Sequence, residues 1–193
     1  VVEPSDSAEA KEFMKYAYDL SEKYDTPVLL RSTTRLSHSQ GVVELEERAE
    51  PFDIPYERDV AKYVMMPGNA IKRHLVVEAR MKQLALDANE FPINGWNTTT
   101  CPWDLSQTAL LPVREGGHAE ASVLKLGLVN PLPRKLIEEF ASKVDKLYIF
   151  EELEPVVEEQ VKAWGITKAV GKEIFTVQGE YSANLIRERV LEQ

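Results

Sequence analysis

The chain has 193 residues, of which 44% are hydrophobic and 28% are charged, a balance typical of a globular protein with one ordinary domain or two small ones. The formal net charge of −9 argues against nucleic acid and anionic membrane surfaces as partners, because both are negatively charged. The single cysteine excludes an intrachain disulfide and a four-cysteine iron–sulfur site, and no apolar run approaches the roughly 20 residues of a membrane span.

The N-terminal part predicts a helix followed by a strand. The single cysteine favours a reducing cytoplasm. The first residues have no signal-peptide pattern, and they lack an initiator methionine, so we expect a chain that begins inside a longer reading frame. Residues 5–24 predict an amphipathic helix, because good N-cap residue types precede an apolar stripe formed by Phe13, Ala17 and Leu20. Pro27 ends this helix, and residues 27–34 predict a short buried strand that turns polar at its carboxyl end.

Polar side chains gather directly after this strand, at Arg31, Thr34, Arg35 and His38. Ligands bind beyond the carboxyl ends of strands in open parallel sheets. Guanidinium and hydroxyl groups there could hold a carboxylate or phosphate, and an imidazole could carry a proton. The alternative is a solvated loop whose arginines pair with nearby glutamates such as Glu44 or Glu46.

The middle of the chain is less regular. Residues 42–68 contain Pro51, Pro55 and Pro67 and predict no regular element. Residues 69–88 predict a linker helix that packs along a neighbour through one face, formed by His74, Val77, Met81, Leu84 and Ala88. Residues 97–120 follow neither a strand nor a helix period, and we expect a poorly packed segment that supplies no strand.

From Ala121 onward, strands and helices alternate. The predicted strands are residues 122–129, 146–150 and 173–177. The predicted helices are one entered through Asn130-Pro131, with a stripe from Leu132 to Val144, and those at residues 155–164 and 182–191. Such alternation favours a parallel α/β sheet.

The residues alone assign neither a catalytic residue nor a metal ligand, and they leave the cofactor-binding residues unknown. There is no dinucleotide-binding or phosphate-loop glycine pattern and no nucleophile elbow. Glu151, Glu152 and Glu154 follow the strand at residues 146–150. Carboxylates at such a position could be acid–base groups or metal ligands, but more often they form the solvated start of a helix. Zinc is not indicated, because no second cysteine stands at ligand spacing from Cys101 or His118.

Three segments, covering most of the chain in order, resemble the thiamine-diphosphate-dependent 2-oxoacid:ferredoxin oxidoreductase family, most closely its indolepyruvate:ferredoxin oxidoreductase alpha subunits. Residues 25–44 contain Thr-Pro-Val-Leu-Leu-Arg-Ser-Thr-Thr-Arg-Leu-Ser-His-Ser-Gln-Gly. Residues 67–78 contain Pro-Gly-Asn-Ala-Ile-Lys-Arg-His. Residues 121–187 contain Leu-Gly-Leu-Val-Asn-Pro-Leu-Pro and Tyr-Ile-Phe-Glu-Glu-Leu-Glu-Pro.

This resemblance implies a fold and a function. Residues 1–55 are expected to form the end of a thiamine pyrimidine-binding domain, residues 56–96 a linker with a helix, and residues 97–193 a transketolase-C-terminal-like parallel α/β domain. The full complex is expected to convert indolepyruvate and coenzyme A to acyl-CoA, carbon dioxide and reduced ferredoxin. It would use thiamine diphosphate, Mg²⁺ and [4Fe–4S] clusters and pair with a beta subunit. The loop with Arg31, Thr34, Arg35 and His38 would border the substrate cleft.

The departures from the family pattern imply that this chain alone is inactive. The family's pyrimidine-activating glutamate, its magnesium–diphosphate motif and its cluster cysteines have no counterpart here, so we expect none of these cofactors to be held by this chain alone. A non-catalytic interaction or scaffold protein, or a truncated gene product, remains the alternative.

Residues 97–120 depart from the family in a different way. The family has a strand and a helix here, with a Tyr-x-Tyr-Val-(Arg/Lys)-Glu-Ala run. Codons can be chosen for residues 110–118 so that a reading one nucleotide later gives Tyr-Tyr-Gln-Tyr-Val-Arg-Glu-Ala-Met. We favour a compensated frameshift over an ordinary divergent loop.

Overall fold

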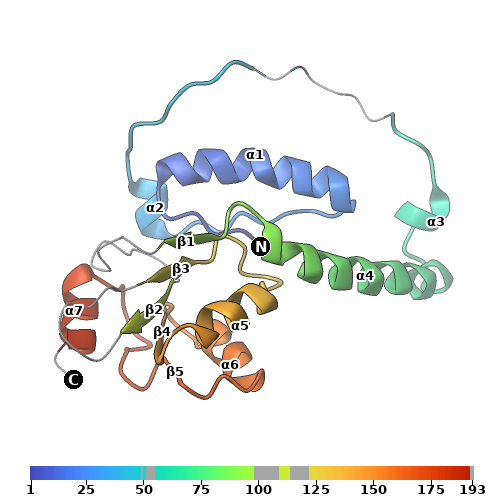
Figure 1. Cartoon of the computed structure of the whole chain (residues 1–193). Helices are drawn as coiled ribbons and strands as arrows, with labels where there is room; N and C mark the ends of the chain where they lie inside the picture. The colour runs from blue at the N-terminus through green and yellow to red at the C-terminus, as the bar shows by residue number, and fades with distance from the viewer. Residues whose placement is uncertain (49, 51–54, 98–108, 114–121, 192–193) are drawn as a thin grey trace.

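A five-stranded sheet with helices on both faces forms the C-terminal part of the molecule, and helical segments from the N-terminal part lie beside it (Figure 1). This architecture is that of a computed structural model, which describes residues 1–48, 50, 55–97, 109–113 and 122–191. The α/β class predicted from the alternating pattern is therefore confirmed.

The sheet is mixed, with strand order β1-β3-β2-β4-β5. Its strands are β1 (Gly95–Asn97), β2 (Ala109–Val113), β3 (Val123–Lys125), β4 (Lys146–Phe150) and β5 (Ala169–Val170). β2 pairs antiparallel with both β3 and β4, β4 pairs parallel with β5, and β1 is antiparallel to β3. The prediction of a wholly parallel sheet is wrong, since residues 114–122 between β2 and β3 are fewer than the dozen or so that a parallel crossover needs.

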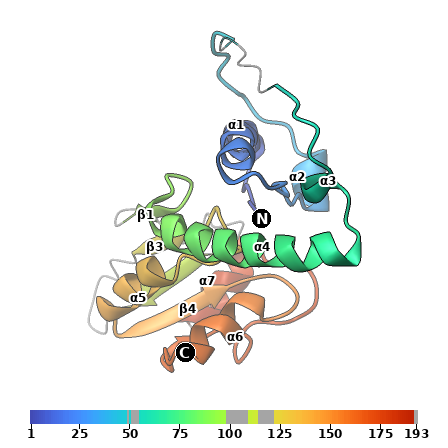
Figure 2. The same ribbon diagram turned by 90° about the vertical axis from the view of Figure 1, so that its right-hand side faces the viewer.

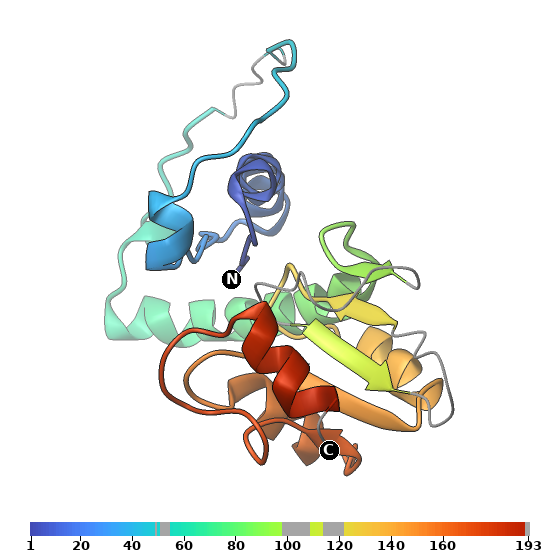
Figure 3. The same ribbon diagram turned by 90° about the vertical axis from the view of Figure 1, so that its left-hand side faces the viewer.

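Side chains alternate between two cores on opposite faces of this sheet. Along β4, Leu147 and Ile149 face the first core, which also contains side chains from α5 (Arg134–Ser142) and α6 (Val156–Ala163). Tyr148 and Phe150 face the second core, beneath α7 (Ala183–Leu191). Figure 3 shows α7 lying across the face of the sheet opposite α6. Consecutive buried residues such as those at positions 147–150 of β4 are typical of a sheet buried on both sides.

Three predicted C-terminal elements differ from the structure, and the first is the strand expected at residues 122–129, which is confined to β3. The helix expected to begin at residues 130–131 begins at Arg134 after Pro133, although its predicted apolar stripe is buried apart from the half-buried Leu136. The strand predicted at residues 173–177 is wrong, because Ile174 and Phe175 both donate backbone hydrogen bonds to the Gly171 carbonyl and so form a turn. This turn places Phe175 in the second core, and β5 supplies the edge of the sheet instead.

The predicted first helix is confirmed as α1 (Ser7–Tyr24), capped by Asp6 and packed through its predicted stripe. The extended N-terminus then joins the two parts of the molecule. Val2 bridges Leu30 on one side and Leu128 on the other. The Val2 amide donates to the Leu29 carbonyl over 2.8 Å, and the Glu3 amide to the Gly127 carbonyl over 2.9 Å.

The strand predicted at residues 27–34 is reduced to this single bridge at Leu30. It is also not fully buried, because Leu29 is 66% exposed while Val28 and Leu30 are half-buried. The polar loop after it forms the short helix α2 (Thr34–His38), which begins where the Thr33 hydroxyl accepts a hydrogen bond from the Leu36 amide.

Helix α3 (Val60–Tyr63) leads into the long helix α4 (Pro67–Asp87), which continues as the short 3-10 helix η1 (Ala88–Glu90). Figure 2 shows α1 lying above α4, with the sheet below. The predicted linker helix is confirmed, but its predicted stripe packs only at the carboxyl end. Ala88 is buried and Met81 and Leu84 half-buried, whereas His74 and Val77 are exposed because the helix extends beyond α1 there.

The sequence predicts no strand within residues 97–120, and this prediction is wrong for Ala109–Val113, which form β2. The other residues from 98 to 120 lie outside the described residues, as does most of the proposed frameshift run. Among the helices in the described residues, none is long and apolar enough to cross a membrane.

Candidate functional site

A cavity of about 430 Å³ lies where the N-terminal part meets the carboxyl end of β4. The beginning of α1, the α2 segment, the residues after β4 and the segment leading into α7 all contribute to its wall. Its size falls within the roughly 300–1,000 Å³ range of small-molecule sites. The charged residues in its lining are Glu3, Asp6, Arg31, Arg35, Glu151, Glu152 and Glu180.

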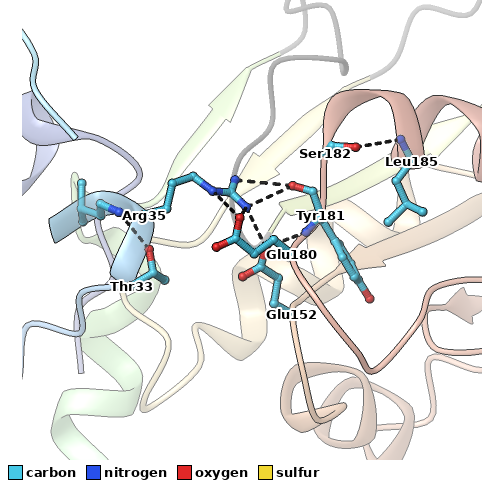
Figure 4. A network of polar contacts seen from close by, with 8 residues as sticks. Thr33, Arg35, Glu152, Glu180, Tyr181, Ser182 and Leu185 are labelled. Atoms are coloured by element: carbon cyan, nitrogen blue, oxygen red, sulfur yellow. Dashed lines mark hydrogen bonds and ion pairs between the residues drawn. The ribbon is translucent and has the colours of Figure 1, made fainter. Parts of the chain in front are cut away.

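Arg35 spans the cavity and contacts the C-terminal part of the chain (Figure 4). Its Nη2 and Nε lie 2.8 and 3.1 Å from the same oxygen of Glu180, Oε2. Nη2 also lies 3.5 Å from Oε1 of Glu152, and both terminal nitrogens lie 3.5 Å from the Tyr181 carbonyl. The guanidinium is therefore already surrounded by oxygen acceptors.

Arg31 is paired in a similar way, with Glu3. Glu3 is only 7% exposed, because Val2 and Glu3 are held between residue 30 and residue 127. Burial raises the pKa of Glu3, and the charge of Arg31 opposes that shift. The pair keeps an acidic group in the cavity wall.

Glu151, another residue of the cavity lining, is hydrogen-bonded to the start of α6. Glu151 accepts from the Val157 and Glu158 amides over 2.8 and 2.9 Å, so its carboxylate caps that helix. Burial raises the pKa of Glu151, and these two hydrogen bonds act against the shift. The helix-capping alternative for Glu151 is thus the one the geometry supports.

Tyr181 lines the cavity above a half-buried lysine. Its hydroxyl donates to the Thr176 carbonyl over 2.7 Å and accepts from Lys172 over 2.8 Å. Burial, reinforced by the nearby carboxylates, raises the pKa of Tyr181 to about 12. Burial also lowers the pKa of Lys172, although the surrounding glutamates oppose this. Both groups hold the segment that carries Glu180 against the sheet.

Of the four predicted substrate-binding residues, the structure brings two to the cavity. Arg31 and Arg35 line it, whereas Thr34 and His38 are exposed on α2 and are absent from the described lining. The arginines do pair with glutamates, as the alternative proposed, but their partners are Glu3, Glu152 and Glu180.

Glu44 and Glu46, the partners suggested by proximity in the sequence, lie instead beside Lys11 and Lys15 of α1. No local pattern links Arg35 with Glu180, which is 145 residues away along the chain. Sequence reasoning therefore missed Glu3 and Glu180 as members of the site.

The arrangement suits an ion-pairing site better than a metal centre. Five carboxylates and two guanidinium groups line the cavity. Within the described part of the chain, no three histidine, cysteine, aspartate or glutamate side chains are placed to hold a metal ion. The sequence also contains one cysteine, whereas a [4Fe–4S] cluster takes four thiolates. The described residues therefore do not fit a metal ion, and the cysteine content does not fit a [4Fe–4S] cluster.

Sequence comparison relates the chain to one named subunit in several archaea. It is 37% identical over 171 residues to the indolepyruvate oxidoreductase subunit IorA of Methanothermobacter thermautotrophicus, covering 84% of this chain and 28% of that protein. The IorA of Thermococcus kodakarensis is 36% identical over 88% of this chain and 28% of its own length. The IorA of Methanothermobacter marburgensis is 33% identical over 98% of this chain and 33% of its own length.

The chain thus spans about 30% of the length of these curated relatives. No protein-family model matches it. No solved structure matches it either.

Proposed function

This chain is homologous to one segment of indolepyruvate oxidoreductase subunit IorA, and on that premise we propose that it serves as part of an indolepyruvate-oxidising enzyme. The observation that carries the proposal is sequence identity of 33–37% across most of the chain. A scaffold function has no comparable support. The catalytic activity, substrate and partners belong to the whole protein and are part of the proposal.

Within that enzyme, we propose that the loop at residues 31–38 lies against the 2-oxoacid. Arg31 and Arg35 carry this idea, because guanidinium groups bind carboxylates and both line the cavity. Thr34 and His38 belong to the same proposed loop but lie outside the described lining. The full complex would include a beta subunit, thiamine diphosphate with Mg²⁺ and [4Fe–4S] clusters, and would use coenzyme A and ferredoxin.

A chimeric subunit tests the proposal. The matching segment of the Methanothermobacter thermautotrophicus subunit would be replaced by this chain, and indolepyruvate oxidation measured in the assembled complex. We expect activity in the chimera. Changing Arg31 and Arg35 together to Gln should lower kcat/KM roughly ten- to a hundredfold, because a charged contact to the substrate carboxylate is lost.

Arg134→Gln is the matched control for the loss of a guanidinium. Arg134 pairs with Glu138 on α5 and is not part of the cavity lining in the described residues. Its replacement should leave kcat/KM unchanged. An assembled chimera without activity contradicts the proposed function, and an active chimera that tolerates both arginine changes contradicts the substrate-binding role.

A further inference from the structure

A guanidinium can bind a ligand carboxylate only with donors that are not already paired with another acceptor. The Arg35 guanidinium is paired with the Glu180 carboxylate. The shortest contact is 2.8 Å, and the Glu180 carboxylate occupies one side of the guanidinium inside the cavity wall (Figure 4). The cavity as a whole carries more carboxylates than guanidinium groups. In this arrangement it repels an incoming anion.

We propose that Glu180 sets the charge selectivity of the cavity by competing with an anionic ligand for Arg35. The inference rests on the proposed function, since the anion is the carboxylate of an aryl 2-oxoacid or a similar acid. Glu180 then acts as a specificity-determining residue. An acid enters only by displacing its carboxylate from Arg35, whereas a neutral analogue meets no such penalty.

The contacts of Glu180 mark it as the exchangeable partner. Its side chain is 64% exposed, and among the described residues Arg35 is its only hydrogen-bonding or ion-pairing partner. Glu152 is more firmly held, because its Oε1 also accepts the Tyr181 amide over 2.8 Å and its side chain is only 27% exposed. Glu3 is buried against Arg31. Exposed ion pairs contribute little free energy, so a ligand can replace this one.

Arg35 should stay in position when the Glu180 charge is removed. Its terminal nitrogens retain the Tyr181 carbonyl and the Glu152 carboxylate at 3.5 Å. Its backbone belongs to α2, which is fixed by the Thr33 cap. Replacing Glu180 with Gln therefore removes a negative charge without removing the guanidinium that the ligand needs.

Binding of two indole ligands of nearly equal shape tests the inference. Indole-3-acetate carries a carboxylate and indole-3-acetamide does not, and neither is a 2-oxoacid that can react. Dissociation constants for the purified chain would be measured by calorimetry at low and at high salt. In E180Q we expect about three- to fivefold tighter binding of the acetate, the effect of losing an exposed competing pair, and no change for the acetamide.

Further variants isolate the role of Arg35. E152Q/E180Q should extend the gain for the acetate, since the amide oxygen of a glutamine side chain can still accept the hydrogen bond that Glu152 receives from the Tyr181 amide. Adding R35Q to E180Q should abolish the gain.

E173Q is the matched control. The Glu173 side chain is also 64% exposed and pairs with Lys162, and Glu173 is not among the described residues that line the cavity. Salt should shrink the difference between E180Q and the parent.

The outcomes separate the two proposals. If the acetate binds the parent and E180Q equally, or if E173Q gives the same gain, the selectivity role of Glu180 is wrong while the carboxylate site stands. If no variant binds the acetate, the inference is overturned. If the chimeric complex nevertheless oxidises indolepyruvate, the proposed function survives that loss.

Discussion

At the scale of single residues, Gly127 shows how a side chain can be excluded by backbone packing. A Cβ atom placed there would lie 2.2 Å from the Ile93 carbonyl oxygen and 2.8 Å from Cζ of Phe13. The Ile93 segment cannot easily move away, because the Gly127 and Leu128 amides donate to the neighbouring Asn94 side chain. The close approach joins the β3 segment to α1.

We expect Gly127→Ala to lower the free energy of unfolding by about 1–3 kcal/mol, the usual cost of overpacking. Gly68→Ala is the control, because a Cβ there meets nothing within 4 Å and alanine favours helix. Chemical denaturation of both variants measures the effect. Equal stability of the two variants would contradict the close packing at Gly127.

The cavity residues mark the limit of prediction at this scale. The sequence pointed to Arg31 and Arg35 because charged groups followed an apolar run, and the structure places both at a cavity. It could not identify Glu3 or Glu180 as their partners. Those contacts depend on how distant segments fold together, and no local pattern encodes them.

At the scale of elements, strongly periodic segments were predictable and short extended ones were not. The stripe of α1 and the proline and glycine that bound α6 follow from local propensity, and both helices are confirmed. The strand predicted at residues 173–177 failed because Phe175 is buried by a turn rather than by pairing. A short apolar run predicts burial but not the backbone conformation that achieves it.

Helix α6 gives a prediction for pH dependence through its cap, Glu151. Because the pKa of Glu151 is raised above the ordinary value of 4.5 in the folded chain, the folded state binds this proton more tightly than the unfolded state. The contribution of Glu151 to stability is therefore greatest at low pH. It falls as the pH rises from about 4.5 through the raised pKa.

Glu151→Gln should remove this part of the pH dependence and cost about 0.5–2 kcal/mol of stability at neutral pH, since one capping acceptor is lost. Melting temperatures of the parent and variant would be recorded between about pH 4 and pH 8. Glu154→Gln, at an exposed position beside the same helix, is the control. An unchanged slope in Glu151→Gln would show that the proton is bound elsewhere.

At the scale of the whole molecule, the sequence predicted the class of fold better than its topology. Alternating strands and helices indicated α/β, but strand direction depends on connection length, and β2 reverses because the link to β3 is short. The division into domains at residues 55 and 96 stays a prediction. The extended N-terminus contacts both sides of that division, because Val2 forms β-bridges with Leu30 and with Leu128.

The whole chain also yields a prediction about cofactor content. A [4Fe–4S] cluster takes four cysteine thiolates, and the sequence supplies only Cys101. We therefore expect the purified chain, treated anaerobically with iron and sulfide, to show no cluster absorbance and no indolepyruvate-dependent reduction of methyl viologen. An intact IorA-containing complex, treated identically, is the comparison, and the proposed function predicts both signals for it. Absorbance of an iron–sulfur cluster in the purified monomeric chain, or reduction of methyl viologen by the chain with indolepyruvate, would contradict this prediction.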